Sequence, residues 1–215
     1  YLSKRAALLH FFLNDNNAAI EDLKRALQIN KEYVYAINFI GRIYEKTNQI
    51  ELALIEYNKG ILLKTADPKS AAYSYRNRAD IFKTQERYNE AINDYTKAIE
   101  LNPNIDFFYQ NRGNIYRKYL KEYNLAILDY TKAIELNPNN EWTYYHRGNL
   151  YAYQLNDNAS ALKDFRRALK VDPEFINVIN AIGLLYAKQG ELKRALQEYE
   201  KGIALENRYP VDAGF

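Results

Sequence analysis

Apolar residues recur at helical spacing along the whole chain. In the stretch 72–105, Tyr75, Ala79 and Phe82 stand at positions i, i+4 and i+7, and a second set with the same steps begins at Ala91. This spacing places side chains on one face of an α-helix, because the helix completes a turn about every 3.6 residues. The stretch therefore predicts two successive helices, each with a single apolar face.

The same pair of helices is predicted several times. The string DYTKAIELNPN occurs at 94–104 and again at 129–139, and a more divergent version follows. The prolines that close these segments, Pro103, Pro138 and Pro173, are 35 residues apart, and each follows Asn or Asp. Proline disfavours the α conformation of the residue before it, so each marks a helix end. The sequence therefore predicts a tandem repeat with about this period.

Small residues occupy equivalent positions on both helices of the repeats, which lets two helices cross closely. They are Gly41, Ala79, Gly113, Gly148 and Gly183 on first helices, and Ala53, Ala91, Ala126, Ala161 and Ala195 on second helices. With the aromatic residues and the closing proline, this pattern resembles the tetratricopeptide repeat (TPR) family. The resemblance covers nearly the whole chain. It implies an all-α fold, a right-handed α-solenoid superhelix of about six helix-turn-helix TPR units.

We expect a single TPR solenoid domain over residues 1–209 and a C-terminal tail at 210–215. Its repeats are about 1–33, 34–71, 72–105, 106–140, 141–175 and 176–209. Repeats four and five carry one extra residue between their helices. Ser70 is a candidate cap for the helix that follows the long exit from repeat two.

The two end repeats depart from the motif. Repeat one has Ala7 in place of the glycine and His10 in place of the motif tyrosine, and repeat six has Gly202 in place of an alanine and no closing proline. End repeats of a solenoid have one uncovered face and are commonly atypical. Because the chain also lacks a starting Met and an evident capping helix, we expect a fragment of a longer array or of a multidomain protein.

An arginine and an aspartate recur together in three repeats. The pairs are Arg78 with Asp94, Arg112 with Asp129, and Arg147 with Asp164. Each arginine directly precedes the small residue of the first helix, and each aspartate directly precedes the aromatic residue of the second. The pattern predicts a structural ion pair between the two helices of each of these repeats.

Composition removes several classes of function. The chain of 215 residues has no cysteine and 2 histidines, and it lacks HExxH, GxSxG and P-loop patterns. We therefore expect no enzyme, no catalytic residues, no metal and no cofactor. No apolar run approaches the roughly 18 residues that would span a membrane. Nothing fixes the compartment, with a cytoplasmic location slightly favoured.

The family resemblance implies that the first helices line the concave side, where extended peptides usually bind. The predicted concave face is mostly basic, with Lys4, Arg5, Arg42, Lys46, Arg76, Lys83, Arg117, Lys118 and Lys188 against Glu45 and Asp80. The net charge of the whole chain is only +3, so it does not reveal that basic residues are concentrated on this face. A basic concave face favours an acidic partner. The alternative is that these side chains are merely solvated.

Asparagines and aromatic residues accompany the basic ones on this face. An asparagine amide both donates and accepts, which suits an extended peptide backbone, although this chain is rich in Asn throughout. Aromatic residues at one rim are candidates for side-chain pockets or for packing between repeats. The candidate groove residues are Tyr35, Asn38, Arg42, Tyr73, Arg76, Asn77, Lys83, Phe107, Asn111, Asn114, Arg117, Trp142, Tyr145, His146, Asn149 and Asn180.

These observations favour a non-catalytic scaffold or adaptor that binds an extended, net acidic peptide or partner segment in its concave groove. The alternative is structural: self-assembly, including homo-oligomers, or docking within a larger multidomain protein. Nucleic acid binding is less favoured, because Glu45 and Asp80 interrupt the basic track. The family's clamp for chaperone C-termini is poorly matched, because Asp80, Trp142 and His146 stand where it needs Asn, Lys and Arg.

Overall fold

The computed structural model describes residues 1–208, which form twelve α-helices and one short π-helical segment. The elements are α1 (Leu2–Phe11), α2 (Asn16–Ile29), α3 (Val34–Lys46), α4 (Ile50–Leu62), α5 (Pro68–Thr84), α6 (Tyr88–Leu101), α7 (Asp106–Ile115), η1 (Tyr116–Leu120), α8 (Tyr123–Leu136), α9 (Glu141–Tyr153), α10 (Asn158–Val171), α11 (Ile176–Lys188) and α12 (Leu192–Arg208). No strand occurs among these residues, so the all-α prediction is confirmed. The predicted tail at 210–215 lies outside the described residues.

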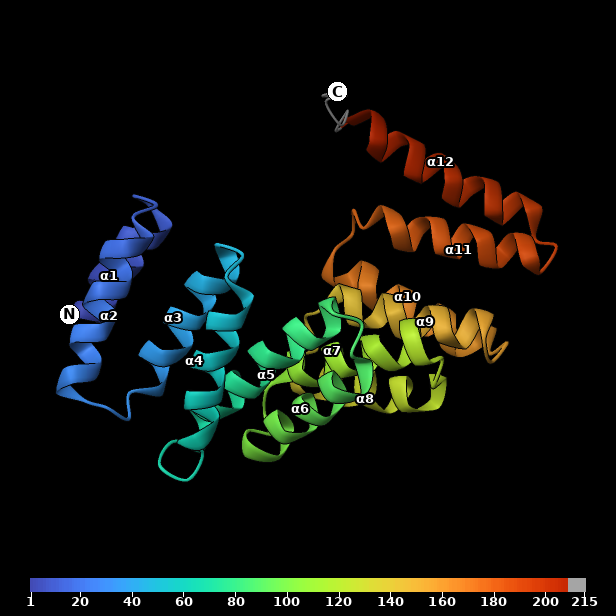
Figure 1. The fold of residues 1–215 in the computed structure, drawn as a ribbon. Coiled ribbons are helices and arrows are strands. Elements are labelled where there is room, and N and C mark those ends of the chain that lie inside the picture. The colour runs from blue at the N-terminus through green and yellow to red at the C-terminus, as the bar shows by residue number, and fades with distance from the viewer. Residues whose placement is uncertain (209–215) are drawn as a thin grey trace. The chain divides into compact units, whose positions relative to one another are not determined.

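Within each compact unit, paired helices form hairpins whose two members pack side by side, as α11 and α12 do in Figure 1; the other such pairs are α1 with α2, α3 with α4, α5 with α6, and α9 with α10. The second helix of a hairpin also packs against the first helix of the next hairpin, as α2 does against α3. The chain divides into two compact units, an N-terminal unit (Tyr1–Ile115) and a C-terminal unit (Tyr116–Phe215). Within each unit, the hydrophobic core therefore lies between neighbouring helices.

Helix ends follow the predicted signals, with one correction. Helices α6, α8 and α10 each end one residue before the Asn or Asp that precedes a proline, in accordance with the restriction that proline imposes. The prediction that Ser70 caps α5 is wrong. Asp67 is the N-cap, and its carboxylate accepts a hydrogen bond of 3.0 Å from the backbone N–H of Ser70. Pro68 occupies the first helical position, where its missing N–H has no cost.

Each hairpin turn contains one residue with positive φ: Asn14, Asn48, Glu86, Lys121, Asn156 and Gly190. The next residue donates its N–H back to the first helix. The acceptor lies five residues back in the short turns, as from Gln49 to Tyr44 O, and six residues back in the long turns, as from Glu122 to Tyr116 O. The extra residue predicted for repeats four and five is therefore accommodated in the turn.

Repeat one also has the long turn, because Asp15 donates to Leu9 O, six residues back. The sequence assignment of Ala7 and His10 as motif residues is therefore wrong by one position. Ala6 is fully buried at the helix crossing, whereas Ala7 is only half-buried. The corrected alignment places Arg5 in the position of the paired arginines.

Two of the three predicted ion pairs join the two helices of their hairpins. Arg78 donates from Nε and Nη2 to Asp94 at 2.7 and 2.8 Å, and Arg147 contacts Asp164 through the same atoms, both at 2.8 Å. These bidentate contacts satisfy carboxylates that are almost completely buried.

A further pair that the sequence alignment missed joins Arg5 to Asp22. The guanidinium of Arg5 lowers the pKa of the buried Asp22 carboxyl. Arg112 and Asp129, the remaining predicted pair, belong to different compact units.

The same arginines also tie neighbouring hairpins together. Arg147 Nη1 donates to Thr131 Oγ1 at 2.8 Å, so this one side chain links α8, α9 and α10. Replacing Arg147 with Leu leaves the Asp164 carboxylate buried without its counter-charge. We expect the free energy of unfolding to fall by about 3 kcal/mol, measured by urea denaturation followed by circular dichroism.

The matched control is Arg194→Leu, which removes an exposed pair with Glu191 and should cost well under about 1 kcal/mol. The double variant Arg147→Leu, Asp164→Leu should recover much of the lost stability, because no buried charge remains. Equal effects of the two single variants would contradict a structural role for the buried pair.

Candidate functional site

Buried tyrosines of the second helices extend their hydroxyl groups to the first-helix face of the N-terminal unit. Tyr57 donates to Glu45 at 2.8 Å, and Tyr95 donates to Asp80 at 2.5 Å. Burial, reinforced by the carboxylate beside each ring, raises the pKa of both phenols. The two acidic residues that interrupt the basic face are therefore acceptors for buried hydroxyl groups.

Asp80 is further neutralised by two cations from its own helix, α5. Arg76 Nε lies 2.9 Å from Asp80 Oδ2, and Lys83 Nζ lies 3.0 Å from Oδ1. Two basic residues of the predicted groove are thus already paired with the acid that lies between them.

A cavity of about 370 Å³ opens on this face of the N-terminal unit. Its lining residues are Phe11, Tyr35, Asn38, Phe39, Arg42, Ser70, Tyr73, Arg76, Asn77 and Phe107, from α1, α3, α5 and α7. Five aromatic rings dominate the wall, and Arg76 lies over the Phe107 ring with its guanidinium carbon 5.2 Å from the centroid. Its volume lies at the lower end of the range of small-molecule ligand sites, and its lining combines aromatic rings with a few polar groups as such sites do.

Two of the asparagines predicted to contact a peptide backbone, Asn38 and Asn77, lie at this cavity and are almost completely buried. Asn38 Nδ2 donates to Ser70 O at 3.0 Å, and its Oδ1 accepts from Ser74 Oγ at 2.6 Å. Asn77 Oδ1 accepts from Arg76 Nη1 at 3.0 Å. The amide of Asn38 therefore joins α3 to α5, which is a structural role.

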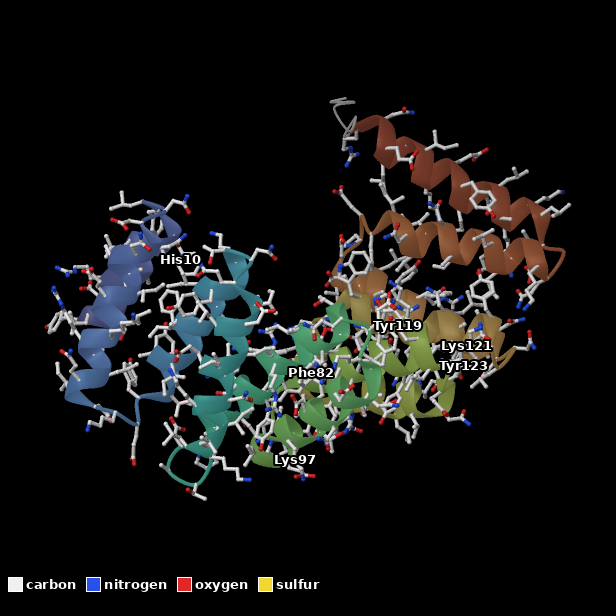
Figure 2. All side chains as sticks on the ribbon, viewed as in Figure 1. His10, Phe82, Lys97, Tyr119, Lys121 and Tyr123 are labelled. Carbon is white, nitrogen blue, oxygen red and sulfur yellow. The ribbon has the colours of Figure 1, made fainter. Side chains whose placement is uncertain are left out.

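Arg42 and Lys46 are the exposed cations beside this cavity. Both project from α3, and within residues 1–208 no ion pair engages either of them. They also line an adjoining cavity of about 430 Å³, together with His10 of α1. His10, labelled in Figure 2, is held by a hydrogen bond to Asn16 and by an edge contact with the Phe39 ring.

The C-terminal unit contains an aromatic cluster around His146. The imidazole lies between the rings of Tyr130, Trp142 and Tyr145, with centroid distances of 6.0, 6.0 and 5.4 Å. Arg117 donates to Tyr130 Oη at 3.0 Å. Burial, with a smaller contribution from the charge of Arg117, lowers the pKa of His146 to about 4. The imidazole is therefore neutral at pH 7.

A second, smaller cavity of about 260 Å³ lies on the first helices of the same unit. It is lined by Tyr145, Asn149, Tyr153, Asn177, Asn180, Ala181 and Leu184 of α9 and α11. No hydrogen bond to the side chains of its three asparagines is formed by the described residues, which contrasts with Asn38. These amides are accessible to a ligand backbone.

The remaining predicted residues lie outside these cavities. Asn111 and Asn114 are on α7, and Lys188 is fixed by Ala152 O and Asn156. Arg5 was wrongly counted among the concave-face cations, because the register error in repeat one concealed its pairing with Asp22. The cavity residues Phe11 and Phe39 were missing from the candidate groove residues, although helical spacing alone places both on the first-helix face.

Among residues 1–208 there is no cluster of three or more His, Asp or Glu side chains placed to hold a metal ion. The same residues include no helix both long enough and apolar enough to cross a membrane.

A tandem array of helical hairpins with an aromatic cavity on its first helices defines a repeat protein of the interaction class. Models of the tetratricopeptide repeat match residues 5–33, 34–67, 72–105 and 176–209, and a TPR repeat model matches 117–154 and 152–190. The chain belongs to the tetratricopeptide repeat family, whose members are protein-interaction scaffolds and are generally non-catalytic.

Known relatives share parts of this architecture. Tetratricopeptide repeat protein 13 of Homo sapiens is 36% identical over 103 residues, which are 46% of this chain and 11% of that protein. PilF of Pseudomonas aeruginosa aligns with a TM-score of 0.76 at 19% identity, covering 98% of this chain and 91% of PilF. YrrB, described as a TPR protein with an unusual peptide-binding site, aligns with a TM-score of 0.68 at 23% identity, covering 88% of this chain and 95% of YrrB.

The low pKa of His146 predicts a loss of stability in mild acid. An unfolded histidine has a pKa near 6.5, so between about pH 6.5 and 4 the unfolded chain binds a proton that the folded chain does not. Lowering the pH through this window should therefore decrease the free energy of unfolding, by about 3 kcal/mol at its lower end.

NMR titration of the imidazole signals measures the pKa directly, and the variant His146→Phe assigns the signal. The same variant should remove most of the loss of stability between pH 7 and 4.5. An imidazole that titrates near 6.5 in the folded protein would contradict the buried, neutral state.

Proposed function

We propose that this chain is a non-catalytic protein-interaction module whose N-terminal unit binds an extended, net acidic peptide or partner segment. The cavity between α3, α5 and α7 takes one large apolar side chain of the partner, and Arg42 and Lys46 pair with flanking carboxylates. The observation that carries the proposal is that an aromatic cavity lies beside two cations without an ion pair among residues 1–208.

Charge on this face supports an acidic partner over a basic one. The hydroxyl of Tyr57 binds Glu45, while Tyr95, Arg76 and Lys83 surround Asp80. Because these carboxylates already accept hydrogen bonds or form ion pairs within the chain, the electrostatic field at the cavity mouth is dominated by Arg42 and Lys46. A partner with Lys or Arg at these places would be repelled.

The cavity lining supports a side chain that fills space. At one wall, the ring centroids of Tyr73 and Phe107 are 6.2 Å apart. At the other wall, the ring centroids of Phe11 and Phe39 are 5.9 Å apart. Aromatic anchors of this kind contribute much of the affinity of peptide complexes. The site exists in the unliganded chain, so little reorganisation is needed on binding.

The peptide-binding description of YrrB agrees with this proposal. The asparagine-lined cavity of the C-terminal unit is a second candidate contact, in which free amides would pair with an extended backbone.

Replacing Arg42 with Gln removes a cation from the cavity mouth without disturbing any ion pair of the described residues. The probes are two peptides of equal length, each with one tryptophan, flanked by Asp and Glu in one and by Lys and Arg in the other. Wild type should bind the acidic peptide, and Arg42→Gln should weaken that binding about tenfold in fluorescence anisotropy.

Arg166→Gln is the matched control, because Arg166 is an exposed arginine of α10 outside the cavities described above. It should leave the affinity unchanged. Stronger binding of the basic peptide, or equal losses in the two variants, would contradict the assignment of the acidic partner.

Replacing Tyr73 with Ala opens one wall of the cavity while removing a side chain that is already 37% exposed. Binding of the acidic peptide should weaken about tenfold, because its tryptophan loses aromatic contact. An acidic peptide with Ala in place of tryptophan should bind weakly to wild type and lose little further in Tyr73→Ala. Equal losses for both peptides would show that the tryptophan does not use this cavity.

A further inference from the structure

Neighbouring hairpins are joined by a recurring apolar contact. At these junctions, the residue two positions after the small residue of the first helix packs against the alanine of the preceding second helix and against the large residue four positions after that alanine. Ile81 packs with Ala53 and Tyr57, and Leu150 packs with Ala126 and Tyr130 in the same way. Ile81 and Leu150 are almost completely buried.

Leu8 occupies this position on α1, two residues after Ala6, but its side chain is 56% exposed. At the other end of the described chain, α12 presents the kind of surface that receives such a residue. Leu196 and Ile203 are 60% and 57% exposed, whereas the equivalent Ile92 and Ile99 of α6 pack against hydrophobic core residues. Helix α1 thus exposes the apolar residue that inserts at an internal junction, and helix α12 exposes the kind of apolar surface that receives it.

A polar contact recurs at the same junctions. Nη1 of the arginine that precedes the small residue donates to a side chain on the preceding second helix: Arg78 to Asn58 at 2.6 Å, Arg112 to Thr96 at 2.9 Å, and Arg147 to Thr131 at 2.8 Å. The accepting residue is always five positions after the alanine of its helix.

The two end helices carry an oppositely charged version of this contact. Arg5 uses Nε and Nη2 for Asp22, and no hydrogen bond from its Nη1 is formed within residues 1–208. Its side chain is 60% exposed. Five positions after Ala195 on α12 is Glu200, which is exposed and forms no ion pair in the described part of the chain.

We propose that a second copy of this chain docks head to tail, with its α1 on the outer face of α12. Leu8 of one copy packs at Leu196, and its Arg5 pairs with Glu200 of the other. Arg5 and Glu200 carry opposite charges where the internal junctions have a neutral acceptor, and this charge complementarity favours a second copy as the occupant. Such a contact is heterologous, so it produces rings or open chains of copies.

The test uses the full chain in sedimentation velocity over a wide concentration range. Wild type should associate as concentration rises. Because Leu8 and Leu196 are exposed, Leu8→Glu and Leu196→Glu should fold normally and weaken association about tenfold or more. The control Leu128→Glu changes an exposed leucine of α8, 66% exposed, and should associate like wild type.

Mixing the two variants distinguishes head-to-tail docking from other modes. The Leu8→Glu copy retains an intact α12, and the Leu196→Glu copy retains an intact α1. An equimolar mixture should therefore form a heterodimer and nothing larger, although each variant alone remains monomeric.

Three outcomes would overturn the proposal. A wild type that stays monomeric at millimolar concentration would leave these faces to another occupant, such as a further repeat or a different protein. Self-association of Leu8→Glu alone would indicate contact between two α12 helices. Unchanged association in both variants would place the interface elsewhere.

Discussion

The close approach of the two helices in each hairpin is the constraint on which the structure depends. In the hairpins of α3, α9 and α11, a glycine of the first helix faces the ring of an aromatic residue on the second. A Cβ atom on Gly148 would lie 2.6 Å from a ring carbon of Phe165, and one on Gly183 would lie 2.6 Å from Tyr199. This contact fixes which side of the first helix is buried. The opposite side remains available for binding.

The same constraint explains the polar residues of that available side. Rings as large as Tyr57 and Tyr95 fill the hairpin interior completely, so their hydroxyl groups emerge beside the first helices and require acceptors there. Glu45 and Asp80 meet this requirement. The charge available to a partner is therefore smaller and more localised than a count of residues suggests, and it is concentrated at Arg42 and Lys46.

Much of the architecture could be predicted from the sequence. The period, the helix ends before Pro103, Pro138 and Pro173, and two of the ion pairs follow from spacing alone, because local geometry determines them. Repeat one was misaligned because its turn is longer by one residue and its helix has no glycine to mark the crossing. The division into two compact units left no signal in the sequence.

The candidate site could be predicted less completely. Its lining residues from α3 and α5 follow from helical periodicity, but the roles of individual side chains depend on three-dimensional contacts. Asn38 was expected to contact a peptide, whereas its amide bridges to Ser70 and Ser74 across the long exit from repeat two. The length and path of that exit determine this contact, and neither is encoded in the repeat motif.

The central claim is that partners bind to the first helices because packing occupies the second helices. Hydrogen exchange with and without the acidic tryptophan peptide, followed by mass spectrometry, tests it most directly. The account predicts slower exchange in α3 and α5 with little change in α2, α4 and α6. Protection confined to α4 and α6 would contradict it.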